Sequence, residues 1–235
     1  MPALAERPSL RWSDLGLRAA SAAVLAPLAL GAIWFGGWIF SVLVIVLALG
    51  LAIEWLMLCR RPAAWHGRVG LCAAGLGYVA LAAVSILWLR ADPAAGRANV
   101  LFLVLIVWAG DISAYLIGRL VGGPRLAPHV SPGKTWSGAV GGLAGAIVVG
   151  LAAAYVLASS APVWRAVPLA ACLGVVAQAG DLLESFVKRR LEVKDSSHLI
   201  PGHGGLFDRL DAVLAVAPVA ALLALTLGRG VVLWQ

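Results

Sequence analysis

A dense group of charged residues between positions 178 and 211 carries the clearest sign of chemistry in this sequence. Its acids include Asp181, Glu184, Asp195, Asp208 and Asp211, and its bases include Lys188, Arg189, Arg190, Lys194 and Arg209. The residues around this group are mostly apolar, and charged side chains at a membrane edge are costly enough that they usually serve a function. Carboxylate oxygens suit Mg²⁺, and basic side chains bind phosphates. The pattern therefore predicts metal-assisted chemistry on a nucleotide or a phospholipid headgroup.

Helical spacing places several of these residues on one face of a helix. Successive steps of three, four and three residues separate Gln178, Asp181, Ser185 and Lys188, and Glu184 lies beside them. We expect this polar stripe to face the bundle interior or a water-filled cleft.

A glycine-rich stretch then leads into a helix with two more acids. Residues 200–205, IPGHGG, forbid a regular helix and suit a loop that approaches a ligand closely. Asp208 and Asp211 share a face at the start of the next helix, so we expect them to converge with Asp181 as metal ligands. Within the loop, His203 is expected to touch phosphate or to orient a neighbour. A zinc site is not expected, because the two histidines of this stretch lack a third soft ligand.

Two motifs upstream add polar groups. Residues 108–119, WAGDISAYLIGR, place Asp111, Tyr115 and Gly118 on one helix face that leads toward a basic loop. A single Asp in a span also occurs as the structural partner of another buried polar group, and this alternative stays open. We favour the functional interpretation because Asp111 shares its face with Tyr115.

The second upstream motif, residues 131–138, reads SPGKTWSG and predicts a turn followed by the start of a helix. Ser131 opens the turn, Thr135 can cap the helix, and Lys134 beside a helix N-terminus makes an anion site. This is not a P-loop, since the first glycine of that pattern is missing and no strand is expected before it. The alternative is a capped loop whose lysine only sets membrane topology.

The composition is that of an integral membrane protein. Of the 235 residues, 62% are hydrophobic and 12% charged, against roughly a quarter charged in soluble domains. The net charge of +7 does not indicate nucleic-acid binding, because the bases punctuate apolar runs and are typical of topology determinants and anionic-lipid contacts. The three cysteines, Cys59, Cys72 and Cys172, form no CxxC pair and are expected to be small buried hydrophobic residues.

Apolar runs long enough to cross a bilayer define the fold class, an all-α polytopic membrane helix bundle of about seven transmembrane helices. The expected spans are residues 17–35, 38–58, 69–89, 98–120, 135–158, 163–190 and 210–228. With a cytoplasmic N-terminus, 14 of the 18 lysines and arginines fall on the cytoplasmic side, which the positive-inside rule favours. We expect an N-terminal transmembrane region, 1–95, and a catalytic region, 96–235. The latter holds the cytoplasmic loops 119–135 and 188–209.

Two features of the spans concern packing. Glu54 is the only charged residue in 19–59, and we expect it to snorkel or to pair with another helix. Small-xxx-small pairs predict close helix packing at Gly138, Gly141, Gly142 and Gly145.

These motifs together resemble a known enzyme family. Residues 185–211, SFVKRRLEVKDSSHLIPGHGGLFDRLD, closely resemble the sequence hallmark of the phosphatidate cytidylyltransferases, also called CDP-diacylglycerol synthases. WAGDISAYLIGR and SPGKTW resemble that family's two upstream motifs, in the same order. The likeness covers residues 100–215, whereas the first three spans share only hydropathy with it.

The resemblance implies an enzyme that transfers a cytidylyl group from CTP to phosphatidate, giving CDP-diacylglycerol and pyrophosphate in phospholipid biosynthesis. It implies Mg²⁺ with two cation sites, a homodimer among membrane lipids, and an active site on the cytoplasmic face of the inner membrane. The expected metal ligands are Asp181, Asp208 and Asp211. The expected catalytic residues are Lys188, Arg189, Lys194, His203 and Asp208. The expected substrate contacts are Asp111, Tyr115, Ser131, Lys134, Thr135, Ser185 and Arg209.

Two departures from the family pattern keep other functions open. Gly133 stands where a lysine or asparagine is expected, and the chain is short in its N-terminal region. The alternatives are another membrane lipid nucleotidyltransferase, an isoprenoid-alcohol kinase or a degenerate paralogue. A transporter is less favoured, because the acids cluster at one membrane face and no internal repeat is visible.

Overall fold

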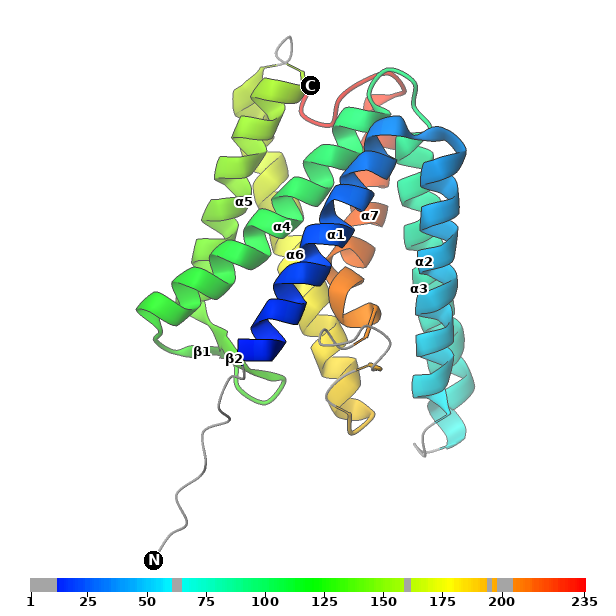
Figure 1. The fold of residues 1–235 in the computed structure, drawn as a ribbon, viewed down its shortest axis with the longest axis vertical. Coiled ribbons are helices and arrows are strands. Elements are labelled where there is room, and N and C mark those ends of the chain that lie inside the picture. The colour runs from blue at the N-terminus through cyan, green and yellow to red at the C-terminus, as the bar shows by residue number, and fades with distance from the viewer. Residues whose placement is uncertain (1–11, 61–64, 159–161, 194–195, 198–204) are drawn as a thin grey trace, which may run out of the picture.

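The structure is a computed structural model that describes residues 12–60, 65–158, 162–193, 196–197 and 205–235, and it forms a bundle of long helices (Figure 1). Its helices are α1 (Trp12–Phe35), α2 (Gly37–Cys59), α3 (Trp65–Arg90), α4 (Gly96–Val121), α5 (Trp136–Leu157), α6 (Ala166–Arg190) and α7 (Phe207–Leu227). Among the described residues, six helices are long and apolar enough to cross a membrane, and α1 contributes a shorter apolar stretch, Ala23–Phe35. The predicted all-α polytopic bundle is therefore confirmed, while its orientation in the membrane stays a prediction.

Each expected span coincides with one of these helices, because a long charge-free run can satisfy its backbone in lipid only as a helix. The 3₁₀ turn η1 (Val163–Arg165) precedes α6 and extends the sixth span. The break expected at Gly36 and Gly37 is confirmed, since both adopt positive φ angles of 67° and 57° between α1 and α2. Arg90 donates from Nε to the carbonyl of Ile33 at 2.7 Å and so covers the end of α1.

A small antiparallel hairpin stands where a plain loop was expected. Strand β1 (Arg125–Ala127) pairs with β2 (Ser131–Thr135), with Arg125 opposite Thr135 and Ala127 opposite Ser131. The expectation of no strand before SPGKT was wrong. The pairing satisfies backbone groups in the connection between α4 and α5, which the polar, glycine- and proline-containing sequence does not reveal. The missing first glycine still excludes a P-loop.

Helices α4 and α5 pack closely through the glycines that the sequence singled out. A Cβ atom at Gly138 would meet the carbonyl oxygen of Ala114 at 2.8 Å, and one at Gly142 would meet the Ala114 Cβ at 2.9 Å. Because no side chain fits there, the α4 face with Asp111 lies directly beside the start of α5.

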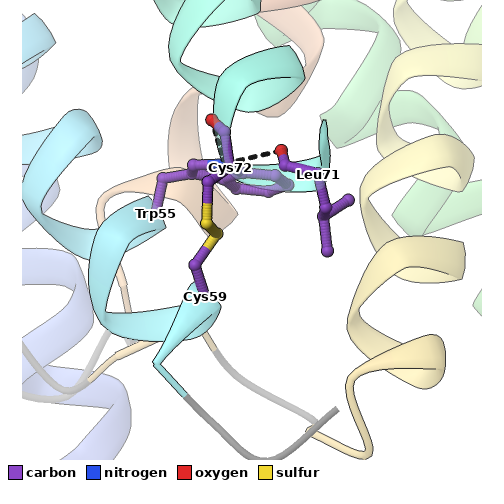
Figure 2. Close-up of a disulfide and its surroundings, with 4 residues drawn as sticks. All are labelled: Trp55, Cys59, Leu71 and Cys72. Atoms are coloured by element: carbon purple, nitrogen blue, oxygen red, sulfur yellow. Dashed lines mark hydrogen bonds between the residues drawn. A yellow bond between two sulfur atoms is a disulfide. The ribbon is translucent and has the colours of Figure 1, made fainter. Parts of the chain in front are cut away.

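Helices α2 and α3 are joined by a disulfide between Cys59 and Cys72 (Figure 2). Beside it, the Trp55 indole N–H is 3.2 Å from the carbonyl oxygens of both Leu71 and Cys72. The expectation of three buried hydrophobic cysteines was wrong for this pair, and Cys172 is exposed. No sequence motif announces the pairing, which arises because the two antiparallel helices bring residues 13 positions apart to one level.

Candidate active site

A polar cavity of about 790 Å³ opens at the end of the bundle where the hairpin lies. Its walls come from α4, the hairpin, α5, α6 and α7. In Figure 1 this is the lower end of the molecule, opposite the end where the chain terminates. Segments far apart in sequence therefore supply one cavity.

Three acids meet inside this cavity. Asp181 and Glu184 on α6 and Asp211 on α7 each offer a carboxylate oxygen within 4.8 Å of the others. Glu184 and Asp211 are buried, with 8% and 9% of their surface exposed. Gly180 permits this convergence, because a Cβ there would meet the Asp211 carbonyl oxygen at 3.2 Å and would also collide with α7 at Ala215.

The acid cluster has the chemistry of a site for a hard divalent cation. Its possible ligands are all oxygens, which suit Mg²⁺. Glu184 Oε1 is buried and has no hydrogen-bond partner among the described residues. A buried carboxylate oxygen without a partner is costly, and a cation held by Asp181, Glu184 and Asp211 would give it one.

Asp208, expected as the third ligand, lies beside the cluster and contacts Lys188. Its Oδ1 accepts a 2.6 Å hydrogen bond from Lys188 Nζ, which also forms a 3.2 Å ion pair with Glu184. Its Oδ2 accepts from the backbone N–H of Gly205 at 3.0 Å and of Ser196 at 3.2 Å. Asp181 and Asp211 thus converge as predicted, and the third member of the cluster is Glu184.

The hairpin brings a lysine to the same acids. Lys134 Nζ lies 2.5 Å from Asp181 Oδ2. The next residue, Thr135, is the N-cap of α5, and its hydroxyl accepts from the N–H of Gly138 at 3.1 Å. The capping role predicted for Thr135 is confirmed, and it fixes the strand end that carries Lys134.

Helix α4 supplies another wall of the cavity. Asp111, Tyr115 and Gly118 all line the cavity, as their shared helix face predicted. The Tyr115 hydroxyl accepts a 2.8 Å hydrogen bond from Arg119. The exposed bases of the cavity are Arg119, Arg125 and Arg209. Buried acids within an open cavity that also carries exposed bases can hold a cation and the phosphates that the cation contacts.

The sequence profile of the Cytidylyltransferase family matches residues 62–227, which include every side chain of this cavity. The chain belongs to this family. A phosphatidate cytidylyltransferase of Brucella abortus biovar 1 (strain 9-941) is 47% identical over 158 residues, covering 67% of this chain and 58% of the relative. One from Staphylococcus aureus (strain COL) is 37% identical over 152 residues, covering 65% of this chain and 57% of the relative. The chain therefore matches little more than half the length of these curated relatives.

Not every residue expected in this cytidylyltransferase-family site lines the cavity. Arg189 is exposed and donates instead to the carbonyl of Val130 at 3.2 Å. Ser185 is half-buried and outside the cavity lining. On α6, Gln178 bonds to α5 and Lys188 bonds to α7. The face of α6 that lines the cavity contains these two residues with Asp181 and Glu184, and Ser185 lies outside it.

Two further expected residues, Lys194 and His203, lie outside the described residues. Ser131, Lys134, Thr135 and Arg209 line the cavity as expected. Sequence reasoning placed Glu184 beside the polar stripe but gave it no role. The signal was present, because Asp181, Glu184 and Lys188 are three and four residues apart and so share a helix face.

Proposed function

We propose that this chain transfers the cytidylyl group of CTP to phosphatidate, giving CDP-diacylglycerol and pyrophosphate. Support comes from the family membership and from relatives that are named phosphatidate cytidylyltransferase. The observation that carries the proposal is the cluster of Asp181, Glu184 and Asp211, two of them buried, in a cavity with exposed bases. A cavity open at the bundle end suits a lipid headgroup that arrives from the membrane and a nucleotide that arrives from water.

The reaction is a nucleotidyl transfer. A phosphate oxygen of phosphatidate forms a bond to the α-phosphorus of CTP, and the bond from that phosphorus to the bridging oxygen of the β-phosphate breaks. Pyrophosphate leaves with the electron pair of the broken bond. Because the attacking oxygen is already anionic near neutral pH, the protein must position the reactants and neutralise charge rather than supply a strong base.

The residues of the cavity divide this work. Asp181, Glu184 and Asp211 would hold Mg²⁺, which when bound supplies charge neutralisation at the transferring phosphoryl group. Lys134 and Lys188 each carry a positive charge next to these acids and lie where phosphates would bind. Exposed arginines of the cavity would pair with phosphate in bidentate fashion.

Further aspects of the function stay predictions, which rest on the resemblance and, for the orientation, also on the positive-inside rule. We expect the site to face the cytoplasm from the inner membrane, because CTP is found on that side, and we expect a homodimer. A second cation site also stays a prediction. The remaining carboxylates of the cavity for such a site are Asp111 and Asp208.

A dual-label assay tests the proposal against its alternatives. The purified chain in mixed micelles with Mg²⁺ and phosphatidate is given each nucleoside triphosphate labelled either at the α- or at the γ-phosphate. The proposal expects α-label from CTP in the organic phase and γ-label only in water-soluble pyrophosphate. Asp211→Asn serves as the inactive control.

Other outcomes would identify other functions. Transfer of γ-label to a lipid alcohol would mean a kinase, and α-label from another nucleotide or onto another lipid acceptor would mean a different nucleotidyltransferase. Absence of any label in the organic phase, from protein that binds CTP, would mean a degenerate paralogue. Each of these results contradicts the proposal.

A further inference from the structure

Glu54 is a buried acid outside the family match and outside the cavity. It lies near the end of α2 with 0% of its surface exposed. Both carboxylate oxygens accept hydrogen bonds from the segment that leads into α7 and from the first residue of that helix. Oε1 accepts from the N–H of Leu206 at 2.8 Å and from the Ser197 hydroxyl at 2.5 Å. Oε2 accepts from the N–H of Phe207 at 2.8 Å and from the Ser196 hydroxyl at 3.3 Å.

These bonds make Glu54 a cap that reaches α7 from another helix. The first N–H groups of a helix have no partner within it, and a negative charge there is favourable because of the helix dipole. Helix α7 begins at Phe207, and its own preceding residue, Leu206, supplies no side-chain cap. Glu54 therefore fills a role that local sequence leaves open. Stacking of Trp55 on Phe207, with ring centroids 5.4 Å apart, fixes the same junction.

One side chain connects this cap to the active site. The Ser196 hydroxyl lies 3.3 Å from Glu54 Oε2 and 3.1 Å from Asp208 Oδ2, so its single hydrogen is shared between two carboxylates. Gly205 completes the junction, because any side chain there would collide with Ser196 and would meet Glu54 Oε2 at 3.1 Å. The position of Asp208, and through it that of Lys188, thus depends on a residue of α2.

We propose that Glu54 is a positioning residue of the transferase site. By capping α7 and holding Ser196, it fixes the Asp208 carboxylate against Lys188, which in turn contacts Glu184 of the acid cluster. Glu54 is not among the residues that line the cavity. The inference rests on the proposed function for its effect on turnover, but its structural part is independent of the reaction.

The decisive variant is Glu54→Gln, which keeps the side-chain size but replaces an accepting oxygen with an NH₂ group that opposes the N–H donors. We expect kcat to fall about tenfold to a hundredfold, with the KM values for CTP and phosphatidate changed less than about threefold. The matched control is Asp92→Asn at the opposite end of the bundle, another buried acid that accepts backbone N–H bonds, from Ala94, Ala95 and Gly230. It should lower stability but leave kcat unchanged.

Hydrogen exchange separates positioning from a merely structural cap. Loss of the cap alone would speed exchange at the amides of Leu206 and Phe207. Loss of the Asp208 position would also speed exchange at Ser196 and Gly205, whose amides donate to Asp208 and not to Glu54. We expect all four amides to exchange faster in Glu54→Gln, and unchanged exchange at Ser196 and Gly205 would overturn the inference.

Two further results keep the test decisive. If Glu54→Gln cannot be produced as folded protein, Ser196→Ala is the second variant, because it removes only the shared hydroxyl. It should lower kcat about threefold to tenfold and leave amide exchange at Leu206 and Phe207 unchanged. A normal kcat would overturn the inference. If the wild-type chain transfers no cytidylyl group, the proposed function fails, and the exchange pattern alone still decides the role of Glu54. Equal losses of kcat in Glu54→Gln and Asp92→Asn would also contradict the positioning role of Glu54.

Discussion

The two ends of the helical bundle both bury carboxylates, but in different surroundings. At the end where the chain terminates, Asp92 is 8% exposed and accepts backbone N–H bonds from Ala94, Ala95 and Gly230. At the cavity end, three acids crowd within 4.8 Å, and one buried oxygen of Glu184 has no hydrogen-bond partner in the part of the chain that the structure describes. Backbone donors satisfy Asp92, and they also satisfy Glu54 at the cavity end, so the contrast lies between Asp92 and the three clustered acids.

The end where the chain terminates, which holds Asp92, is called the closed end below. A second polar side chain there, Asn99, also bonds to backbone groups. The Asn99 side chain accepts from the N–H of Leu233 at 2.9 Å and donates to the carbonyl of Val231 at 3.3 Å. Trp234 is 1% exposed and stacks on Phe102 with ring centroids 4.7 Å apart, and its indole N–H has no hydrogen-bond partner among the described residues. We expect that the hydrogen bonds around Asp92 contribute to stability, whereas the crowding of the three clustered acids lowers stability and serves the proposed function.

The largest expected effect comes from Asp211→Asn, which removes one acid of the cluster. Turnover should fall about a hundredfold or more, because charge stabilisation at the reacting phosphoryl group is lost. In buffer with a chelator, the apparent melting temperature should stay equal or rise, since one of three crowded carboxylates is gone. Activity assays and thermal unfolding in detergent measure the two effects. A clear loss of stability would mean that both ends of the bundle serve the same purpose.

A smaller effect is expected from Lys134→Ala, which removes the cation beside Asp181. We expect kcat/KM to fall about tenfold, mainly through a higher KM for CTP, because the lysine contributes a charge-assisted contact to phosphate. Stability should change by less than about 1 kcal/mol, since both partners of the ion pair are partly exposed. Steady-state kinetics at varied CTP measure this. An unchanged KM with a lower kcat would assign Lys134 to the reaction step instead.

Much of the fold and part of the site could be predicted from the sequence. The spans followed from hydropathy, because each helix satisfies its own backbone within one continuous segment. The convergence of Asp181 with Asp211 followed from helix faces and charge, whereas Asp111 was expected from its helix face only to point toward a basic loop. These predictions use spacing within one segment, which the sequence displays directly.

The remaining features depend on contacts between distant segments. Asp208 lies beside the acid cluster, where it bonds to Lys188 of α6, and Glu184 is the third acid of the cluster. Glu54 bonds to a residue more than 140 positions away. The Cys59–Cys72 pair follows from how α2 and α3 lie side by side, and the hairpin is a local pairing that helical or strand periodicity does not reveal. No local period encodes such pairings. The division into regions 1–95 and 96–235 stays a prediction, although Glu54 links the first to the second.

A modest pH effect is expected at the closed end. Backbone N–H donation, from Ala95 above all and also from Gly230 and Ala94, lowers the pKa of Asp92 below its usual 3.8, and nearby Arg229 adds to this against the opposing effect of burial. The folded state thus binds fewer protons than the unfolded state, so the stabilisation is complete above 3.8 and is lost as the pH falls through the lowered pKa.

Chemical unfolding of the wild type and Asp92→Asn between pH 3 and 6 measures this effect. The difference in unfolding free energy between the two proteins should shrink toward the acid end. A constant difference would mean that the Asp92 charge contributes nothing and that the closed end is not stabilised in this way.

The smallest effect is expected from Arg97→Ala, also at the closed end. The Arg97 guanidinium lies 4.4 Å from the centroid of the Trp34 ring, a contact that contributes about 0.5–1 kcal/mol at an exposed position. Turnover should remain within about twofold of wild type, because the closed end provides no group for the reaction and faces the side away from CTP in the predicted topology. Assays on intact and on opened vesicles measure both points. A large loss of activity would place Arg97 near a substrate, which would reverse the predicted orientation and remove the contrast between the two ends.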